Sequence, residues 1–292
     1  MKVGVQLPEV ERFVPWPEYL AMAKAIEVNG FDSIWMGDHL LYDLPGDQTR
    51  GPYEVWTALA AIAQATERVE LGPLVAATSF HAPPMLAKMA ATVDAISNGR
   101  LILGLGAGWN EREYTAYGFP YGRRVSRFGE ALTIINDLLK TGRSTFHGEF
   151  YDIENCILDP RPIQAHGPQI MLGSIGPRML KIGLPIADAW NVWWSDYGNS
   201  VEGFTRLKDR IGTDKAATAA VFVTLPDGIG RIMAEDYNEG SKAHVPPVPV
   251  DALADHILAM AGAGASHLQL VLDPITIDSI DRVGAVVRGL PH

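Results

Sequence analysis

The chain has 292 residues, which is long enough to bury a large core, and α/β barrels of about 250 residues commonly form one domain. Its formal net charge of −10 argues against a nucleic-acid-binding protein, whose affinity depends on a basic surface. Hydrophobic residues make up 47% of the chain, yet no apolar run approaches the roughly 18 residues that span a bilayer, so we expect no membrane role.

The amino-terminal sequence and the cysteine count also indicate where the protein is located and whether it binds a metal. The amino terminus runs directly into a strand pattern without the charged-then-apolar layout of a secretory signal. Cys156 is the only cysteine, which excludes an internal disulfide and a cysteine metal cage. We therefore expect a cytoplasmic protein without a metal site.

Short apolar runs typical of buried parallel strands alternate along the chain with segments of helical spacing. We expect strands at 3–7, 33–36, 69–75, 100–105, 169–172, 186–192, 217–225 and 268–272. Helices are expected at 19–27, 52–66, 83–96, 111–117, 123–139, directly after 176, 201–211, 251–261 and 277–287. These βα units predict an α/β fold, a (β/α)8 TIM barrel with insertions, over residues 1–292 as one domain.

Two segments interrupt this alternation. Residues 143–159 are rich in aromatic and β-branched residues and predict a small hairpin outside the barrel. Residues 226–249, with glycine, proline and charges, predict a long loop that acts as a lid or insertion.

The carboxyl ends of barrel strands meet at one mouth, where catalytic groups gather. Asp38 and His39 follow the second strand, so they are candidates for that mouth, although a lone His after a strand is often only structural. Gly104 near the end of the fourth strand, and Gly106 and Gly108 after it, leave bare backbone that would admit a flat ligand or allow tight strand–helix packing.

The exit of the fifth strand predicts an anion site. Gly173 to Gly176 form a glycine-rich turn that leads into a helix, so backbone N–H groups and the helix dipole favour a phosphate there. Ser174 adds a hydroxyl and Arg178 a charge; the alternative is a plain helix start. Trp193, Trp194 and Tyr197 crowd the sixth exit, where they line a planar-ligand pocket or simply pack together.

Four blocks of the chain, in the family's order, resemble the bacterial luciferase-like monooxygenases and their deazaflavin-dependent relatives. The blocks are Gly30 to Trp35 with Asp38-His39, Leu86 to Thr92 running to Gly99-Arg100, Gly104 to Trp109 with Glu113-Tyr114 and Tyr117-Gly118, and Ile170 to Gly176 with Ala187 to Asn191. The resemblance implies a luciferase-like barrel, usually a homodimer, that binds FMN or the deazaflavin coenzyme F-420 at the strand ends.

The resemblance also implies roles for single residues. His39 would lie beside the reactive ring carbon, Asp38 would orient it, and a non-proline cis peptide at Leu74-Val75 would back the ring. The cofactor-binding residues implied are Leu74, Val75, Ser79, Gly106, Ala107, Gly108, Trp109, Gly173, Ser174, Ile175 and Gly176.

This chain departs from the family at two places. Sugar-phosphate dehydrogenases of the deazaflavin branch carry an acidic residue where this chain has Trp109, so that reaction is not expected. Relatives often show Thr-Pro-x-Thr after the third strand, whereas this chain reads Ala76-Ala77-Thr78-Ser79, which leaves Ser79 as the expected hydroxyl contact.

These observations favour hydride transfer between coenzyme F-420 and a small organic substrate, with His39 moving a proton and Trp109 and Trp193 lining the substrate side. The polyglutamate tail of F-420 needs basic residues, for which Arg112, Arg123, Arg124 and Arg127 are candidates. One alternative is an FMN monooxygenase that uses O2 and reduced flavin from a partner reductase. Others are a flavin-binding protein without turnover and a glycoside hydrolase using Glu9, Asp38 and Asp273.

Overall fold

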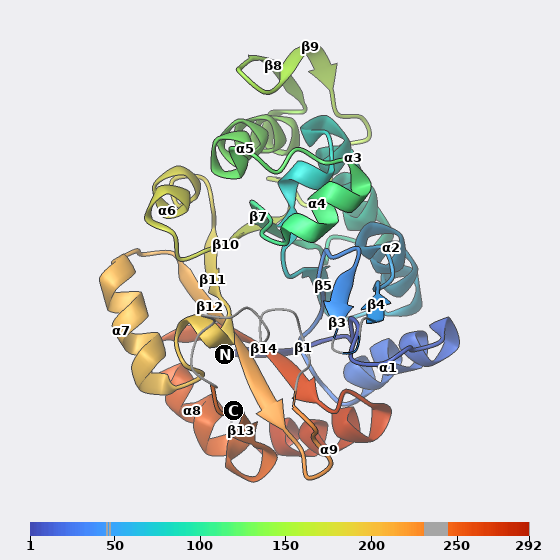
Figure 1. The fold of residues 1–292 in the computed structure, drawn as a ribbon, viewed down its shortest axis with the longest axis vertical. Helices are drawn as coiled ribbons and strands as arrows, with labels where there is room; N and C mark the ends of the chain where they lie inside the picture. The colour runs from blue at the N-terminus through green and yellow to red at the C-terminus, as the bar shows by residue number, and fades with distance from the viewer. Residues whose placement is uncertain (45, 47, 231–244, 292) are drawn as a thin grey trace.

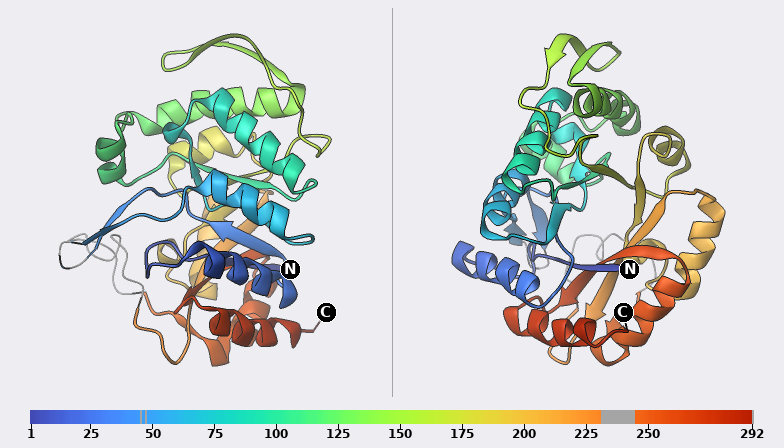
Figure 2. Two further views of the ribbon diagram at one scale, coloured as in Figure 1. Left: turned by 90° about the vertical axis from the view of Figure 1, so that its right-hand side faces the viewer. Right: turned by 180° about the vertical axis from the view of Figure 1, so that it is seen from behind.

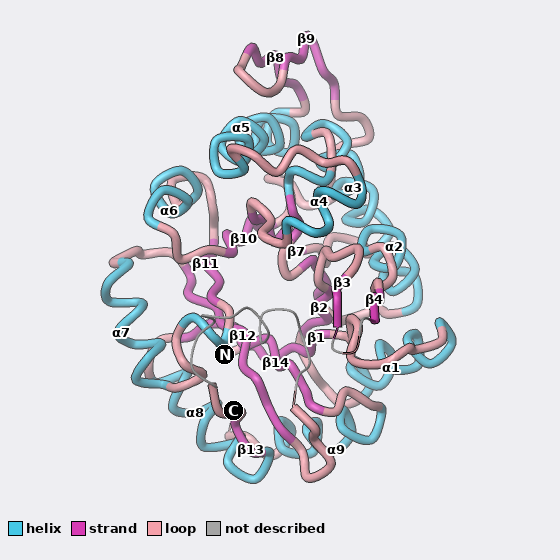
Figure 3. The backbone as a smooth tube through the Cα atoms, viewed as in Figure 1, coloured by secondary structure: helices cyan, strands magenta, loops and turns pink. Residues whose placement is uncertain are grey.

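A ring of parallel strands forms the centre of the protein, seen in a computed structural model that describes residues 1–44, 46, 48–230 and 245–291 (Figures 1 and 3). The strands are β1 (Lys2–Gln6), β2 (Ser33–Met36), β5 (Glu70–Pro73), β6 (Ala76–Ala77), β7 (Ile102–Gly106), β10 (Gln169–Gly173), β11 (Ala189–Val192), β12 (Ala216–Thr224) and β14 (Ala265–Asp273). Their order is β5-β2-β1-β14-β12-β11-β10-β7-β6, and a parallel bridge from Leu71 to Leu101 links β5 to β7. The predicted (β/α)8 barrel is confirmed, with its third strand split into β5 and β6.

Helices surround the ring in Figure 3. They are α1 (Trp16–Val28), α2 (Val55–Ala65), α3 (Pro83–Ile96), α4 (Glu111–Tyr117), α5 (Arg124–Thr141), α6 (Pro177–Gly183), α7 (Val201–Ile211), α8 (Leu253–Gly262) and α9 (Ile277–Arg288). Both chain termini lie on one side of the molecule and α4 lies on the opposite side, in the left-hand view of Figure 2. The strand exits that lead towards α4 therefore face away from the termini.

Side chains alternate between the two faces of the barrel wall, as the two-residue period of a strand requires. Outward residues such as Val3, Val5 and Ile34 join the main core beneath the helices. Inward residues form a separate cluster inside the barrel that comprises Trp35, Leu74, Ile102, Met171 and Ala189. The second strand is thus buried on both faces, as its apolar run predicts.

Some predicted boundaries are wrong. Helix α2 begins at Val55 rather than at 52, because the Glu54 side chain caps it by accepting from the N–H groups of Trp56 and Thr57. Strand β11 begins at Ala189 rather than at 186, because the Gly183 carbonyl accepts from the N–H groups of the two residues at 186 and 187 in a turn after α6.

The loop after β2 holds a hairpin that sequence patterns did not predict. It consists of β3 (Tyr42–Leu44) and β4 (Gln48–Arg50), which have three residues each and are too short for a two-residue alternation to be recognised in the sequence. The predicted outer hairpin is confirmed as β8 (Arg143–His147) and β9 (Asp152–Ile157), which project beyond α5 in Figure 1.

The predicted lid at 226–249 falls largely outside the described residues, which omit 231–244. In its described part, β13 (Val248–Pro249) pairs with β12, and a 3-10 turn at Val250–Ala252 leads into α8.

Candidate active site

His39 follows β2 and is enclosed by groups from three elements. Its Nδ1 lies 3.0 Å from Oε2 of Glu113 and 3.2 Å from Oε1 of the same carboxylate. The imidazole centroid is 4.7 Å from that of Tyr42 and 5.6 Å from that of Trp109. Its side chain is 17% exposed, so the imidazole is held by a carboxylate and still reachable from the mouth.

Glu113, in the first turn of α4, is a site residue that sequence reasoning did not select. Its side chain is 1% exposed, and Oε1 accepts from the N–H of Leu40 at 2.5 Å and of Leu41 at 3.2 Å. The only sequence signal for it is the Glu113-Tyr114 string within the family blocks. Since 74 positions separate it from His39, no local pattern links the two.

The resemblance implies that Asp38 orients His39, but the hydrogen bond that the Asp38 carboxylate makes is to another element. Its carboxylate accepts from the N–H of Ala77 at 2.9 Å, which ties the end of β2 to β6. Burial raises the pKa of Asp38 to about 7, against the opposing effects of the Ala77 hydrogen bond and the nearby His39. The carboxylate hydrogen-bonded to the His39 ring is that of Glu113, and Asp38 anchors the third strand.

The raised pKa of Asp38 predicts a stability effect. The folded protein keeps a proton on this carboxyl that the unfolded chain has lost, so the stabilisation is full below about pH 4 and is lost as pH rises through about 7. Between about pH 5.5 and about pH 8, the free energy of unfolding of wild type should fall by roughly 2 kcal/mol more than that of Asp38→Asn. Urea unfolding at both pH values measures this, and equal pH dependence in the two proteins would contradict it.

Side chains of the protein itself lie close to the glycines at the end of β7 and just after it. A Cβ on Gly106 would lie 2.7 Å from Val75 Cγ2, and one on Gly104 would lie 3.0 Å from Val75 Cγ1. A Cβ on Gly108 would lie 2.0 Å from the Tyr114 hydroxyl. Of the two alternatives predicted for these glycines, the positions of Val75 and Tyr114 favour close packing at the Cβ positions, and ligand contact with the backbone stays a prediction.

The predicted non-proline cis peptide lies between Leu74 and Val75. The Val75 side chain points into the barrel. Leu74 belongs to the cluster inside the barrel, and Val75 and Trp193 pack against that cluster. Gly173 on β10 also faces Val75, since a Cβ there would lie 2.8 Å from both Val75 methyl groups. Residues predicted from the third, fourth and fifth strands thus meet around Val75, and Trp193 packs against the same inner cluster.

The Ser79 hydroxyl is used within the protein. It lies in the 3-10 turn Thr78–Phe80, donates to the Ala107 carbonyl at 3.2 Å, and lies 3.2 Å from the Tyr114 hydroxyl. Tyr114 in turn donates to the Ala107 carbonyl at 2.9 Å. Ser79 therefore lies next to the predicted cofactor residue Ala107 and fixes the shape of that exit.

The turn after β10 keeps the geometry expected of a helix start. Ser174 Oγ accepts from the N–H of Gly176 at 3.2 Å, and the Ser174 carbonyl accepts from the Trp190 indole at 2.7 Å. Arg178 donates to the Ser126 hydroxyl at 2.7 Å. The turn is rigidly held, and its role in binding phosphate remains a prediction.

The burial of the residues at the strand exits shows which of them a ligand can reach. Along the strand exits most residues are buried, but a partly exposed set, which we call the accessible arc, runs from one exit to the next. It consists of His39, Val75, Ala107, Gly108, Gly173, Ser174, Ile175, Gly176 and Trp193. Backbone and small side chains dominate it, which suits a planar ring and its phosphate, and these are the residues that would hold either cofactor.

The four arginines predicted to hold a polyglutamate tail have partners within the chain. Arg112 pairs with Asp43 and Arg123 with Glu149. Arg124 donates to the carbonyls of Gly108 and Tyr121, and Arg127 to that of Gly122. The two ion pairs are about half exposed, and such pairs are worth about 1 kcal/mol or less, so they can exchange for a ligand carboxylate.

The carboxylates of the hydrolase alternative are engaged in structural contacts. Glu9 accepts from the Gln6 amide at 2.8 Å and the Tyr42 hydroxyl at 3.2 Å. Asp273 accepts from the N–H of Gly230 at 2.7 Å and holds the chain after β12. Together with the Asp38 contact, these bonds account for all three acids without glycoside chemistry.

The described residues also bear on whether the protein crosses a membrane or holds a metal ion. Among the helices described there, none is both long and apolar enough to cross a bilayer. Within the same residues, no cluster of three or more histidine, cysteine or acidic side chains is placed to hold a metal ion.

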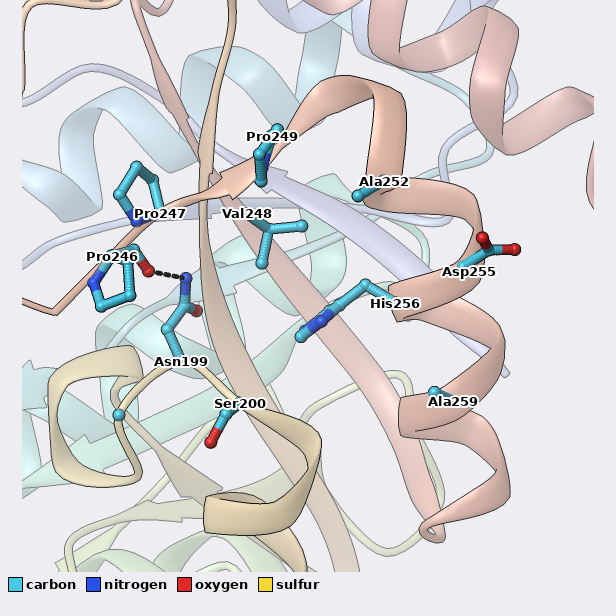
Figure 4. A pocket seen from close by; sticks show the side chains of 11 residues that line it. Asn199, Ser200, Pro246, Pro247, Val248, Pro249, Ala252, Asp255, His256 and Ala259 are labelled. Carbon is cyan, nitrogen blue, oxygen red and sulfur yellow. Dashed lines mark hydrogen bonds between the residues drawn. The ribbon is translucent and has the colours of Figure 1, made fainter.

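A further pocket of about 450 Å³, which we call the outer pocket, lies between residues 198–200, residues 246–249 and α8 (Figure 4). It is mostly apolar and is lined by Asn199, Ser200, Pro246, Val248, Ala252 and His256, among others. Burial lowers the pKa of His256, which favours its neutral form. None of the site residues predicted from the sequence lines this pocket.

The barrel, the accessible arc at its strand exits and the carboxylate-held imidazole define an α/β-barrel enzyme. The chain is an oxidoreductase of the luciferase-like monooxygenase family, whose model matches residues 2–229. It is 31% identical over 289 residues to a phthiodiolone/phenolphthiodiolone dimycocerosates ketoreductase of Mycobacterium tuberculosis, covering 90% of this chain and 75% of that protein. It is 32% identical over 202 residues to the pyrimidine monooxygenase RutA of Rhizobium rhizogenes, covering 64% of this chain and 54% of that one.

Solved structures share the fold. An F420-dependent secondary alcohol dehydrogenase in complex with an F420-acetone adduct aligns with a TM-score of 0.79 and 17% identity, covering 100% of this chain and 99% of that chain. The oxygenating constituent of 3,6-diketocamphane monooxygenase of Pseudomonas putida, in complex with FMN, aligns with a TM-score of 0.72 and 16% identity over the same shares. These likenesses show the luciferase-like barrel fold.

Proposed function

We propose that this protein uses coenzyme F-420 to interconvert a ketone and a secondary alcohol. The observation that carries the proposal is the His39 imidazole, held by a buried carboxylate at one end of the accessible arc. The curated relative that is a ketoreductase and the fold neighbour that is a secondary alcohol dehydrogenase support the substrate class. We also propose that Trp109 and Trp193 line the substrate side.

The chemistry divides between cofactor and protein. When bound, reduced F-420 supplies a hydride. Reduction of a ketone also requires one proton at the carbonyl oxygen, and His39 supplies it, returning to the neutral imidazole. In alcohol oxidation His39 takes the same proton back. Backbone at Ala107 to Gly108 and at Gly173 to Gly176 holds the ring and phosphate, and Trp109 covers the imidazole.

Titration of the purified protein with F-420 and with FMN tests the proposal. We expect F-420 to bind with a dissociation constant of about 10 μM or below and FMN to bind at least about tenfold more weakly. Without oxygen, reduced F-420 should then be oxidised only when a ketone is added, seen as absorbance returning near 420 nm, roughly where the oxidised deazaflavin absorbs. F-420 binding without turnover of any ketone or secondary alcohol would contradict the proposed reaction.

An FMN-dependent monooxygenase is the second candidate, favoured by the FMN-bound fold neighbour and by the relative RutA. In that case a partner reductase supplies reduced flavin, and the protein consumes O2 with its substrate. Tight FMN binding together with substrate-dependent oxygen uptake would replace the ketone–alcohol assignment by this one.

A further inference from the structure

One buried carboxylate connects α4 to the end of β2. Glu113 Oε1 accepts from the N–H groups of Leu40 and Leu41, and both of its oxygens lie within 3.2 Å of His39 Nδ1. Burial of a carboxylate is costly unless hydrogen bonds compensate for the lost water, and these contacts do so. Glu113 thus holds the backbone after β2 and the imidazole at the same time.

The contact determines which ring nitrogen of His39 carries the proton. An ionised carboxylate only accepts hydrogen bonds, so Nδ1 must carry a hydrogen towards Glu113. In the neutral imidazole Nε2 is then the basic atom, and in the charged form both nitrogens are protonated. In the proposed reaction, Nε2 is therefore the atom that would exchange a proton with the substrate oxygen.

We propose that Glu113 is the positioning residue that fixes His39 in the Nδ1–H tautomer and supports its protonated form. The catalytic reading of this inference rests on the proposed function, whereas the tautomer itself does not. Glu113 neither touches the reacting atoms nor replaces His39; it acts through the ring that it holds.

Replacing Glu113 by glutamine should change which ring nitrogen of His39 carries the proton. Oε1 is engaged by two backbone N–H groups, so the amide oxygen of Glu113→Gln takes that place and its NH2 group takes the place of Oε2, 3.0 Å from Nδ1. An NH2 group donates, so Nδ1 must accept and the proton moves to Nε2. The protonated imidazole also loses its anionic partner.

Other charged and titratable groups face this histidine and stay in place in the variant. Among them are Asp38, Glu9 across Gly37 and the Tyr42 ring, and His81 and Glu54 act in turn on Asp38. Because these groups remain in every variant of position 113, a difference between variants reports on the Glu113 contact.

Nitrogen-15 NMR of the protein without cofactor tests the inference directly. The His39 signals are assigned among the eight histidines by their loss in His39→Gln. Wild type and Glu113→Asp should show the Nδ1–H tautomer when neutral, and Glu113→Gln the Nε2–H tautomer. Glu111→Gln, which removes an exposed acid from the same helix, should match wild type. A wild-type Nε2–H tautomer, or no change in Glu113→Gln, would overturn the inference.

Kinetics separate this inference from the proposed function. For ketone reduction, Glu113→Gln should lower kcat about 100-fold with little change in KM, and the loss of rate at alkaline pH should begin at lower pH, because the protonated acid is less favoured. If the tautomer switches but no variant reduces ketones, Glu113 positions His39 and the proposed reaction fails. If wild type reduces ketones and Glu113→Gln keeps the wild-type rate and pH profile, the positioning role fails.

Discussion

His39→Ala is expected to lower kcat for ketone reduction by roughly 10²- to 10⁴-fold, the usual contribution of a general acid. The imidazole is the titratable group on the accessible arc, and its Nδ1 contact with Glu113 leaves proton exchange to the other ring nitrogen. The dissociation constant of F-420 should change by about tenfold or less, because the other arc residues, such as those after β7 and at the end of β10, are untouched. Steady-state kinetics with reduced F-420, together with a binding titration, measures both quantities.

His166→Ala is the matched control, because this histidine is exposed and lies outside the site. It should keep the wild-type kcat. A His39→Ala enzyme that reduces substrate at the wild-type rate would show that the proton comes from another group.

Adding a methyl group at Gly104 or Gly106 is expected to have large but different effects on stability. A Cβ on Gly104 would lie 2.2 Å from the carbonyl oxygen of Pro73, which is backbone, whereas the Cβ on Gly106 meets only the Val75 side chain closely, at 2.7 Å. Overpacking of this kind costs about 1–3 kcal/mol, and more where backbone must move. We expect Gly104→Ala to lose about 3 kcal/mol or more of unfolding free energy and Gly106→Ala about 1–3 kcal/mol.

Val75→Ala distinguishes the two positions. It removes the methyl groups that the Gly106→Ala methyl would strike, so the double variant should be more stable than Gly106→Ala alone, whereas the Pro73 carbonyl still obstructs Gly104→Ala. Urea unfolding of the single and double variants measures this. Equal rescue at both glycines would contradict the packing of Val75 against β7.

Helical periodicity and helix-ending residues predicted a helix well where its ends are set by residues next to it in the sequence. Pro83 and Pro84 start α3, which ends before Asn98-Gly99, and its bounds are those predicted. Helix α2 was placed too early because the side chain of Glu54 is an unusual cap. The β3–β4 hairpin was missed because each of its strands has only three residues, too few for a strand pattern to be recognised.

The sequence predicted which residues form the candidate site better than it predicted the contacts between them. Sequence reasoning selected His39, Val75, Gly106 and Trp193, and the fold brings them to neighbouring strand exits. It could not decide whether the glycines at the end of β7 admit a ligand or close packing, because a sequence cannot show that the Val75 side chain points into the barrel. It missed Glu113 because that contact depends on how α4 folds back over the mouth.

A crystal structure of the protein with F-420 tests the central claim most directly. We predict that the tricyclic ring lies on the accessible arc, against Val75 and the backbone of Ala107 to Gly108, with the His39 imidazole about 4 Å or less from the ring, which is van der Waals contact. Its phosphate should lie at the Gly173 to Gly176 turn. A cofactor bound elsewhere, for example in the outer pocket lined by Asn199 and His256, would contradict the account.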